Sequence, residues 1–182
     1  MHYNEAIRLA KEKLAALEIE SVCARTAAIY DGKTFLVPWL SQFRALDSGK
    51  PAEQVLWLHY LTSSGGGKTT GELIAFRDVH GARFYEPKFC ARAVRPIVKR
   101  FGKDAGGLLK AGLALGGVKA NYGDCAVTLP CFPYVPATYI VWQGDGEMPA
   151  EGSVLFDKSA AGWLSAEDLV VLASLTAYEL IK

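Results

Sequence analysis

Apolar residues recur at intervals of three or four positions in several stretches of the chain, which is the spacing of an amphipathic helix. The first stretch follows Asn4, which can cap a helix, and runs from Ala6 to Leu17. Further helices are predicted over residues 51–61, 87–101, 104–115 and 165–181. Pro96 is expected to kink the helix over residues 87–101, because proline breaks the helical hydrogen-bond pattern.

Runs rich in β-branched and aromatic residues, bounded by turn residues, predict strands elsewhere. Two hairpins are predicted around Asp31-Gly32 and His80-Gly81, with strands over 21–30, 34–40, 72–79 and 82–85. Three more strands are predicted over residues 125–131, 138–143 and 154–156. Hairpins and helices that come in runs, without regular βαβ alternation, favour an α+β fold with a mainly antiparallel, twisted sheet and packed helices.

The composition fits one globular domain over residues 1–182. The length is sufficient to bury a core, and 51% hydrophobic with 21% charged residues is an ordinary balance. No apolar run approaches the ~18 residues that cross a bilayer. The N-terminus is charged and amphipathic and lacks the apolar core of a secretory signal. We therefore expect a cytoplasmic monomer or homodimer that does not enter a membrane.

Charge is distributed unevenly along the chain, although the net value is only +1. Residues 83–119 hold nine Lys or Arg and two Asp or Glu, whereas residues 120–182 hold two and eight. The small net charge argues against a nucleic-acid-binding domain. The basic middle and the acidic end either neutralise each other within the fold or meet partners of opposite sign.

The helix expected over residues 87–101 has a basic face. Its cations recur at four, three and four residues and are Lys88, Arg92, Arg95 and Lys99. The apolar stripe beside them, which can pack inward, consists of Phe89, Ala93, Ile97 and Phe101. The basic face can bind phosphates, an acidic partner or an anionic cofactor such as a tetrapyrrole, with arginine making bidentate contacts. The alternative is a face that is only solvated, which is the commoner case for a run of charges on a helix.

Residues that bind metals or act as nucleophiles show no diagnostic spacing. The four cysteines are scattered and form no C-x-x-C pair, so we expect no zinc or redox site. We expect the cysteines to act as small buried apolar residues. The three histidines lack the H-x-x-x-H and H-E-x-x-H spacings, and no G-x-S-x-G elbow is present. The sequence predicts no metal and leaves any cofactor unknown.

Residues 65–70, Gly-Gly-Gly-Lys-Thr-Thr, resemble the end of a phosphate-binding loop. A P-loop also needs a glycine at the position that Thr62 occupies here, and it follows a strand and opens a helix. In this chain a predicted helix precedes the segment and a predicted strand follows it. Because the order is reversed, a nucleotide P-loop is not expected.

Two further groups of residues are candidates for chemistry. His59 lies in an apolar run near a helix end, where it could be an acid, a base, a metal ligand or a hydrogen-bonded core residue. Asp145, Glu147 and Glu151 follow the strand that ends at Trp142. They could form a ligand or partner site, an acid–base pair or a solvated turn, and they lack the full spacing of a calcium loop.

Several motifs together resemble an uncharacterised family, domain of unknown function 3786. They are Leu58-His59-Tyr60-Leu61, Ile74-Ala75-Phe76-Arg77-Asp78, Tyr85, Phe89, Leu115-Gly116-Gly117, Gly123-Asp124, Pro133 to Pro136, Trp142 to Ala150, Leu155-Phe156-Asp157 and Glu167-Asp168. The family loop more often reads Gly-Asp-Glu-Glu-Phe-Pro, whereas Gly146 and Met148 replace its second acid and its aromatic here. The family is found largely in anaerobes, and some members carry a cysteine-rich cluster segment, which implies a link to iron–sulfur proteins.

We therefore expect a binding or accessory domain for anaerobic redox or metal-cofactor metabolism, acting through a protein partner or a small-molecule ligand. The candidate residues are His59, Tyr60, Arg77, Tyr85, Asp124, Trp142, Asp145, Glu147 and Asp157. The alternative is a small-molecule enzyme that uses His59 or the paired carboxylates in acid–base catalysis. The sequence leaves open whether the chain is an enzyme.

Overall fold

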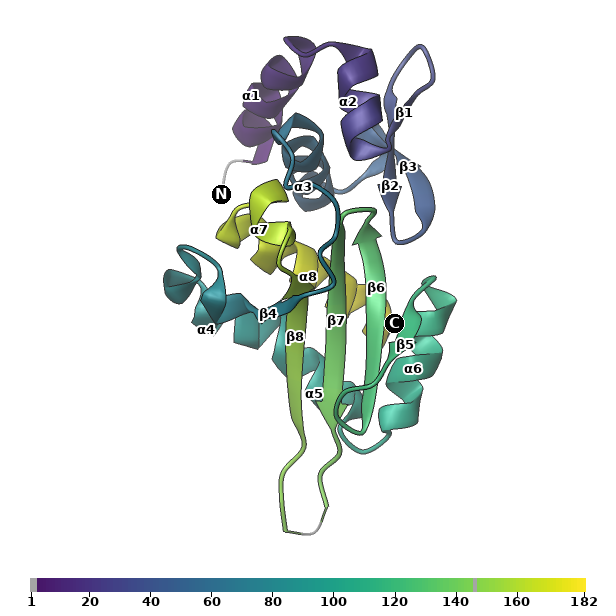
Figure 1. Ribbon diagram of the computed structural model, residues 1–182, viewed down its shortest axis with the longest axis vertical. Coiled ribbons are helices and arrows are strands. Elements are labelled where there is room, and N and C mark those ends of the chain that lie inside the picture. Colours follow the sequence, from purple (N-terminus) through teal and green to yellow (C-terminus); the bar gives the residue numbers. More distant parts are fainter. Residues whose placement is uncertain (1–2, 146) are drawn as a thin grey trace.

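The computed structural model describes residues 3–145 and 147–182 and contains two antiparallel sheets (Figure 1). The smaller sheet has the order β1-β2-β3, with β1 (Ile29–Tyr30), β2 (Phe35–Trp39) and β3 (Gln42–Ala45). The larger sheet has the order β4-β8-β7-β6-β5, with β4 (Leu73–Ala75), β5 (Val118–Ala120), β6 (Cys125–Phe132), β7 (Val135–Trp142) and β8 (Glu151–Asp157). Antiparallel pairing in both sheets, together with the packed helices, confirms the predicted α+β fold.

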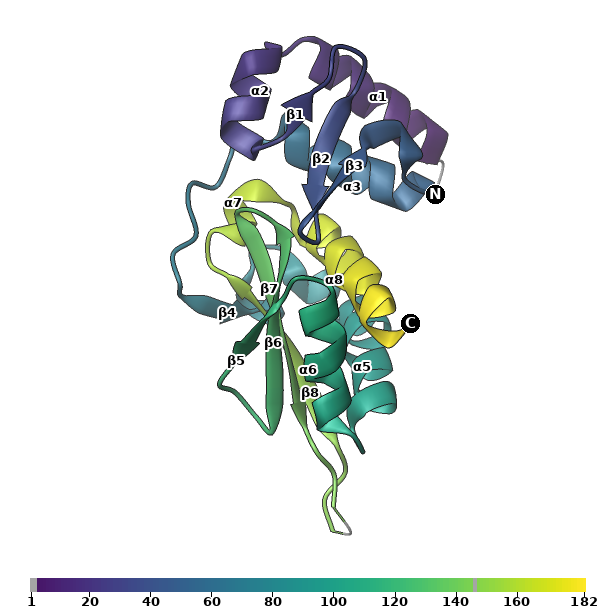
Figure 2. The same ribbon diagram turned by 90° about the vertical axis from the view of Figure 1, so that its right-hand side faces the viewer.

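Helices accompany each sheet. Those near the small sheet are α1 (Tyr3–Ala15), α2 (Ile19–Thr26) and α3 (Pro51–Thr62). Those near the large sheet are α4 (Glu86–Phe89), α5 (Arg95–Phe101), α6 (Ala105–Ala114), the short α7 (Ala160–Trp163) and α8 (Ala166–Ile181). Figure 2 shows α5, α6 and α8 together on one face of the large sheet. Within the described residues, no helix combines the length and the apolar character needed to cross a membrane.

Strand β7 is the centre of the large sheet, and its residues from Ala137 to Val141 are buried. The Tyr139 hydroxyl donates a hydrogen bond to the Ala173 carbonyl at 2.9 Å, which ties β7 to α8. The core continues into the small sheet, because the rings of Trp39 on β2 and Phe132 on β6 lie 5.1 Å apart. The two sheets therefore share one hydrophobic core.

The strand predicted over residues 21–30 is wrong for most of its length, because α2 occupies residues 19–26. Val22 is buried, and the Thr26 hydroxyl donates back to the Val22 carbonyl at 2.7 Å, four residues earlier. Ala27, with a φ of 56°, ends the helix, so that only two residues pair with β2. The β-branched residues favoured a strand, but packing of α2 against α3 overrides that weak preference.

The hairpin predicted around residues 80–81 is also wrong. Only β4 is a strand in this region, and it pairs with β8 instead of with residues 82–85. Residues 76–78 and 82–84 each form a 3₁₀ turn. The Phe76 ring is buried and stacks on Phe89 with a centroid distance of 4.1 Å, so the chain turns into the core after β4.

The helix predicted over residues 87–101 is present but not uniform. Residues 90–94, between α4 and α5, form a π-helical segment in which the Arg95 N–H donates to the Cys90 carbonyl five residues back. Pro96 has no N–H, and its ring crowds the carbonyl four residues before it, so the α-helical pattern is disfavoured there. The distortion expected at Pro96 therefore takes the form of a widened turn.

Candidate functional site

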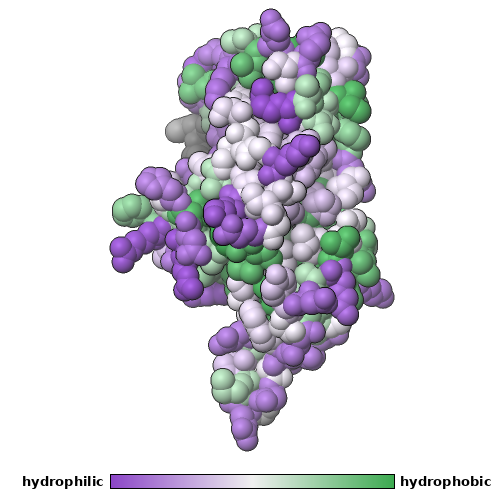
Figure 3. Space-filling model, viewed as in Figure 1, coloured by the Kyte–Doolittle hydropathy of each residue, from purple (hydrophilic) through white to green (hydrophobic). Residues whose placement is uncertain are grey.

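The predicted acidic loop lies at the tip of the β7–β8 hairpin, which projects from the sheet (Figures 1 and 2). Most side chains at this tip are hydrophilic in Figure 3, and Asp145, Glu147 and the apolar Met148 are exposed. The Asp145 carboxylate accepts hydrogen bonds from the backbone N–H groups of Met148 and Glu147 at 2.7 and 2.8 Å, and these bonds lower its pKa. Gly146 lies outside the described residues. The carboxylate thus shapes its own turn.

Two other candidates lie at the same end of the sheet. The Asp124 carboxylate accepts the Gln143 N–H at 2.7 Å, next to the end of β7. Trp142 is 42% exposed on that strand. Neither residue approaches His59, because the β7–β8 tip lies at the opposite end of the sheet from α3 in both ribbon views.

Asp157 ends β8 at the other end of the hairpin and is buried, with 2% of its surface exposed. Its carboxylate accepts hydrogen bonds from the backbone N–H groups of Thr70 and Gly71, and from both the N–H and the hydroxyl of Ser159. Burial by itself would raise the pKa of Asp157, but these bonds outweigh it and lower the pKa to about 2. The carboxylate therefore fastens the segment before β4 to the sheet.

His59 and Tyr85 both meet the first turn of α8. The His59 Nδ1 lies 2.7 Å from the Asp168 carboxylate, and the Tyr85 hydroxyl donates to Glu167 at 3.5 Å. The hydrogen bond to Asp168 raises the pKa of His59. Burial opposes the fall in the pKa of Asp168, but the bond from His59 lowers it overall. The His59 side chain is 41% exposed, so this pair is accessible to solvent.

The remaining candidates separate from one another. Tyr60 is fully buried, stacks on Phe132 and donates its hydroxyl hydrogen to the Thr26 carbonyl at 3.0 Å, so it belongs to the core. Burial raises its pKa. Arg77 is exposed on the 3₁₀ turn after β4. The structure thus brings His59 near Tyr85 but leaves Tyr60, Arg77 and the acidic loop apart.

The basic helix carries a hollow of about 580 Å³ that is lined by Arg95, Lys99, Arg100 and three apolar residues. Lys88 and Arg92, the other two predicted cations, do not line it. The π-helical segment over residues 90–94 contains Arg92 and lies between Lys88 and Arg95, so a simple α-helical count cannot place all four cations on one face.

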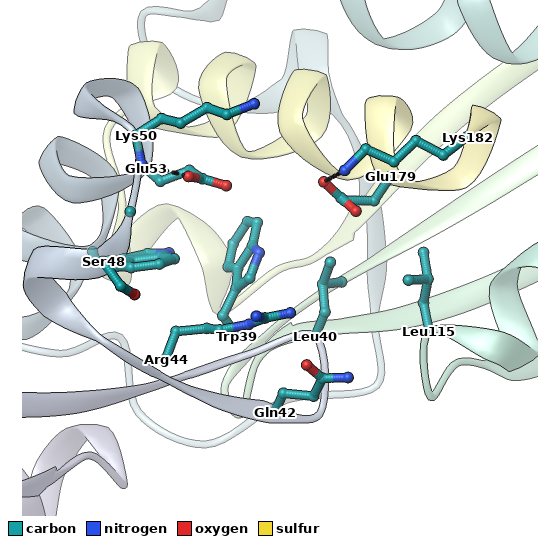
Figure 4. A pocket seen from close by; sticks show the side chains of 12 residues that line it. Trp39, Leu40, Gln42, Arg44, Ser48, Lys50, Glu53, Leu115, Glu179 and Lys182 are labelled. Carbon is teal, nitrogen blue, oxygen red and sulfur yellow. Dashed lines mark hydrogen bonds and ion pairs between the residues drawn. The ribbon is translucent and has the colours of Figure 1, made fainter.

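A more enclosed cleft of about 250 Å³ lies where the small sheet meets the end of α8 (Figure 4). Its walls come from the β2–β3 hairpin, the start of α3, the turn after α6 and the C-terminal end of α8. The lining residues include Trp39, Leu40, Gln42, Arg44, Ser48, Lys50, Glu53, Trp57, Leu115, Glu179 and Lys182. We call this the hairpin cleft.

The hairpin cleft contains charges of both signs. Figure 4 shows Lys50 and Glu53 reaching from α3 toward Glu179 and Lys182 of α8, with Arg44 on the hairpin side. Glu179 is 2.5 Å from the Lys182 ammonium. The described residues offer no carboxylate within ion-pair distance of Arg44 or Lys50. The Lys50 ammonium lies 5.8 Å from the centre of the Tyr178 ring. The cleft therefore holds cations without a carboxylate partner in the described part of the chain and carboxylates that are only partly engaged.

The turn that forms one wall of the cleft is strained. Leu40 and Ser41 have φ angles of 48° and 61°, a left-handed region that costs a non-glycine residue roughly 1–2 kcal/mol. The Leu40 N–H donates to the Cys131 carbonyl at 3.2 Å, and the Leu40 side chain is buried, so tertiary contacts hold this turn in place. Positive φ at both central residues is the usual geometry of a two-residue hairpin loop, which here joins the paired residues Trp39 and Gln42.

The indole of Trp57 in the cleft wall has an unusual environment. Trp57 is 2% exposed, its ring centroid is 6.3 Å from that of Trp39, and its Nε1 has no hydrogen-bond partner among the described residues. An unpaired buried donor costs about 1–3 kcal/mol. Trp57 also lines the cleft, so its indole contributes to the cleft wall.

Sequence reasoning missed the hairpin cleft, because its residues come from four segments that no local motif connects. The one local signal was a pair of tryptophans, Trp39 and Trp57, on either side of the polar residues Gln42, Arg44, Ser48 and Lys50. Among the residues that the structure describes, no three His, Cys, Asp or Glu side chains gather to hold a metal ion.

A family model described as a domain of unknown function (DUF3786) matches residues 18–179. This match confirms the resemblance drawn from the sequence. No curated protein and no solved structure matches the chain.

Proposed function

Since the chain belongs to the DUF3786 family, whose function is unknown, we propose from its geometry that it is a binding domain for a small zwitterionic molecule of amino-acid size. The hairpin cleft is the binding site. The observation that carries this proposal is the convergence of unpaired cations, partly engaged carboxylates and two indoles on one hollow of about 250 Å³.

The charges explain why the ligand is zwitterionic. Arg44 and Lys50 offer donors without a carboxylate partner among the described residues, so they suit an acidic group of the ligand. Glu53 accepts the Lys50 N–H through one oxygen, and Glu179 binds Lys182 through one oxygen. The second oxygen of each carboxylate can accept from a ligand ammonium.

The size of the hairpin cleft and its aromatic walls further limit the range of possible ligands. Pockets for drug-sized ligands occupy roughly 300–1,000 Å³, so the hairpin cleft suits a smaller molecule. Trp39 and Trp57 are both buried and provide apolar surface on which the non-polar part of such a molecule can pack.

The proposal can be tested by titrating the protein with a panel of amino acids and related zwitterions, with tryptophan fluorescence and calorimetry as readouts. Arg44→Gln should weaken binding by about tenfold or more, since it removes a charge-assisted hydrogen bond. Glu179→Gln should weaken the binding of zwitterions but not the binding of the matching acids that lack an ammonium group. Arg77→Gln, at an exposed site elsewhere, is the control. If no zwitterion binds, or if Arg44→Gln binds as the wild type does, the proposal is wrong.

The enzymatic alternative is favoured by the contact between His59 and Asp168. A carboxylate bonded to Nδ1 orients an imidazole and leaves Nε2 to exchange a proton. The test is to incubate the wild type and His59→Asn with a metabolite extract and follow compound loss by mass spectrometry. Acid–base catalysis at His59 requires a compound that the wild type consumes and the variant does not. Identical profiles would contradict it.

A role of the acidic loop in recruiting a partner, and a link to anaerobic redox metabolism, stay predictions. The exposure of Asp145, Glu147 and Trp142 at a projecting tip supports the first. Asp145→Asn combined with Glu147→Gln should leave folding intact and abolish recovery of a basic partner. Unchanged recovery would count against the loop while leaving the hairpin cleft untouched.

A further inference from the structure

The glycine-rich segment over residues 63–71, between α3 and β4, is irregular but fastened at several points. The Trp163 indole N–H donates to the Gly67 carbonyl at 2.9 Å, and Asp157 binds the end of the segment as described above. Gly66 lies so close to α7 that an added Cβ would be 2.6 Å from the Trp163 ring. The segment is therefore held against the protein in one conformation.

This segment presents backbone donors that the fold does not use. The N–H groups of Gly66, Gly67, Lys68 and Thr69 donate no hydrogen bond within the described part of the chain. Gly65 and Gly67 have φ angles of 93° and 79°, whereas Gly66 between them is not left-handed. Successive backbone N–H groups in a turn that no acceptor of the fold uses can bind an anion, as they do in anion-binding nests.

Two cations face the same place. Arg25 of α2 and Lys68 line a hollow of about 300 Å³ together with Tyr134 and Trp163. One Arg25 nitrogen donates to the Leu61 carbonyl at 3.0 Å, while its buried Nε has no partner. Neither cation has a carboxylate within ion-pair distance among the described residues. Their charge is therefore uncompensated.

The aromatic side of the hollow adds a flat apolar surface. The rings of Tyr134 and Trp163 are stacked with centroids 5.4 Å apart and an interplanar angle of 11°. Trp163 is buried by its neighbours, whereas Tyr134 is half-buried and borders the hollow. A planar group attached to an anion can therefore pack against Tyr134 while the anion meets Arg25 and the loop.

We propose that this hollow, which Arg25, Lys68 and the loop residues Ser64, Gly65 and Gly67 line, binds the phosphate group of a small phosphate ester, with the unused N–H groups of Gly67 and Lys68 as its backbone donors. A phosphate carries more negative charge and more acceptor oxygens than a carboxylate, so it suits a site that offers a guanidinium, an ammonium and backbone N–H groups together. The site is not a P-loop, because α3 precedes it and β4 follows it. It is separate from the hairpin cleft and does not depend on the function proposed for that cleft.

The test is a titration of ¹⁵N-labelled protein with inorganic phosphate and with phenyl phosphate, followed by amide NMR. The amide signals of Gly67 and Lys68, which line the hollow, should shift and saturate in the millimolar range or below. Phenyl phosphate should bind more tightly than phosphate, because its ring packs on Tyr134. If these amides do not move with either ligand, the proposal is overturned.

Three variants complete the test. Arg25→Gln should weaken phosphate binding by about tenfold, and Lys68→Gln by about threefold, since each removes a cationic partner. Lys68 is exposed and makes no side-chain hydrogen bond in the described structure, so its replacement keeps the test valid if Arg25→Gln does not fold. Lys33→Gln, at an exposed turn, is the matched control. Wild-type affinity in the Lys68 variant would contradict the site.

A fourth variant separates the two proposals. Arg44→Gln should leave phosphate binding unchanged even if it abolishes binding in the hairpin cleft, because Arg44 does not line the hollow at residues 64–68. A loss of phosphate binding in Arg44→Gln would place the phosphate in the cleft and overturn the assignment made here.

Discussion

Asp157 and Asp145 belong to the same β-hairpin and have opposite roles. Asp157, at the end of β8, is buried and accepts hydrogen bonds from three residues, two of which lie more than eighty positions away. Asp145, at the tip, is exposed and bonds only residues two and three positions on. The comparison shows that a carboxylate stabilises a fold when its partners are distant in sequence and water is excluded.

The largest effect is expected for Asp157→Asn. The substitution removes the charge and puts an amide N–H₂ where one acceptor oxygen faced backbone donors, so we expect a loss of about 3 kcal/mol in unfolding free energy. Urea denaturation would measure it. Phosphate binding in the hollow at residues 64–68 should weaken as well, because the segment loses its anchor. A loss below about 1 kcal/mol would contradict this view of Asp157.

Lowering the pH should reduce the contribution of the Asp157 carboxylate to stability. The pKa of Asp157 is about 2 in the folded protein, below the value of about 4 expected in the unfolded chain. Its contribution is therefore fully present above pH ~4 and is lost as the pH falls toward 2. The stability difference between the wild type and Asp157→Asn should shrink across that interval. A stability difference that stays constant from about pH 5 to about pH 2 would contradict the lowered pKa.

An intermediate effect is expected for His59→Gln, because its partner Asp168 is mostly buried but His59 is not. The bond to Asp168 raises the pKa of His59, and Glu167 adds to this while Lys13 opposes it. The stabilisation that protonated His59 gives the folded state is complete below pH ~6.5 and is lost as the pH rises through the folded-state pKa of His59.

We expect His59→Gln to lower the unfolding free energy by about 1 kcal/mol or less near pH 6, and by less near pH 8, because exposed ion pairs are weak. Thermal unfolding at the two pH values would measure it, with the exposed His80→Gln as the control. If His59→Gln destabilised the protein more at the higher pH, the pH dependence would have the opposite sign, and the raised pKa of His59 could not explain it.

The smallest effect is expected for Asp145→Ala. Its carboxylate is exposed and its partners are its own neighbours, so the midpoint of thermal unfolding should not change measurably. Amide signals of Glu147 and Met148 should shift, which shows that the turn has lost its side-chain bonds. Clear destabilisation would mean that the hairpin tip supports the sheet, and would remove the contrast with Asp157.

Local sequence signals predicted the elements whose causes are local. Ser165 and Asp168 do form a capping box at the start of α8, and Pro51 begins α3. The failures have non-local causes. Residues 21–26 are helical because Val22 is buried in a core that the segment cannot specify alone. β4 pairs with a strand some eighty residues later, which no hairpin rule anticipates.

The candidate sites divide in the same way. Sequence reasoning identified His59 but could not pair it with Asp168, 109 residues away. It rejected the Gly-Gly-Gly-Lys segment as a P-loop because a helix precedes the segment and a strand follows it. It could not foresee that tertiary packing brings Arg25 of α2 to the same segment. The hairpin cleft was missed because four distant segments build it.

The π-helical segment has a consequence for how the helix around it meets the core. Phe89, Ala93, Ile97 and Phe101 are all buried and recur every four residues, whereas an α-helix completes a turn in 3.6. On a uniform α-helix this stripe would rotate by about 40° at each step and leave the core within a few steps. The wider turn at residues 90–94 corrects the phase once, midway, so that a four-residue period stays in register with the sheet from end to end.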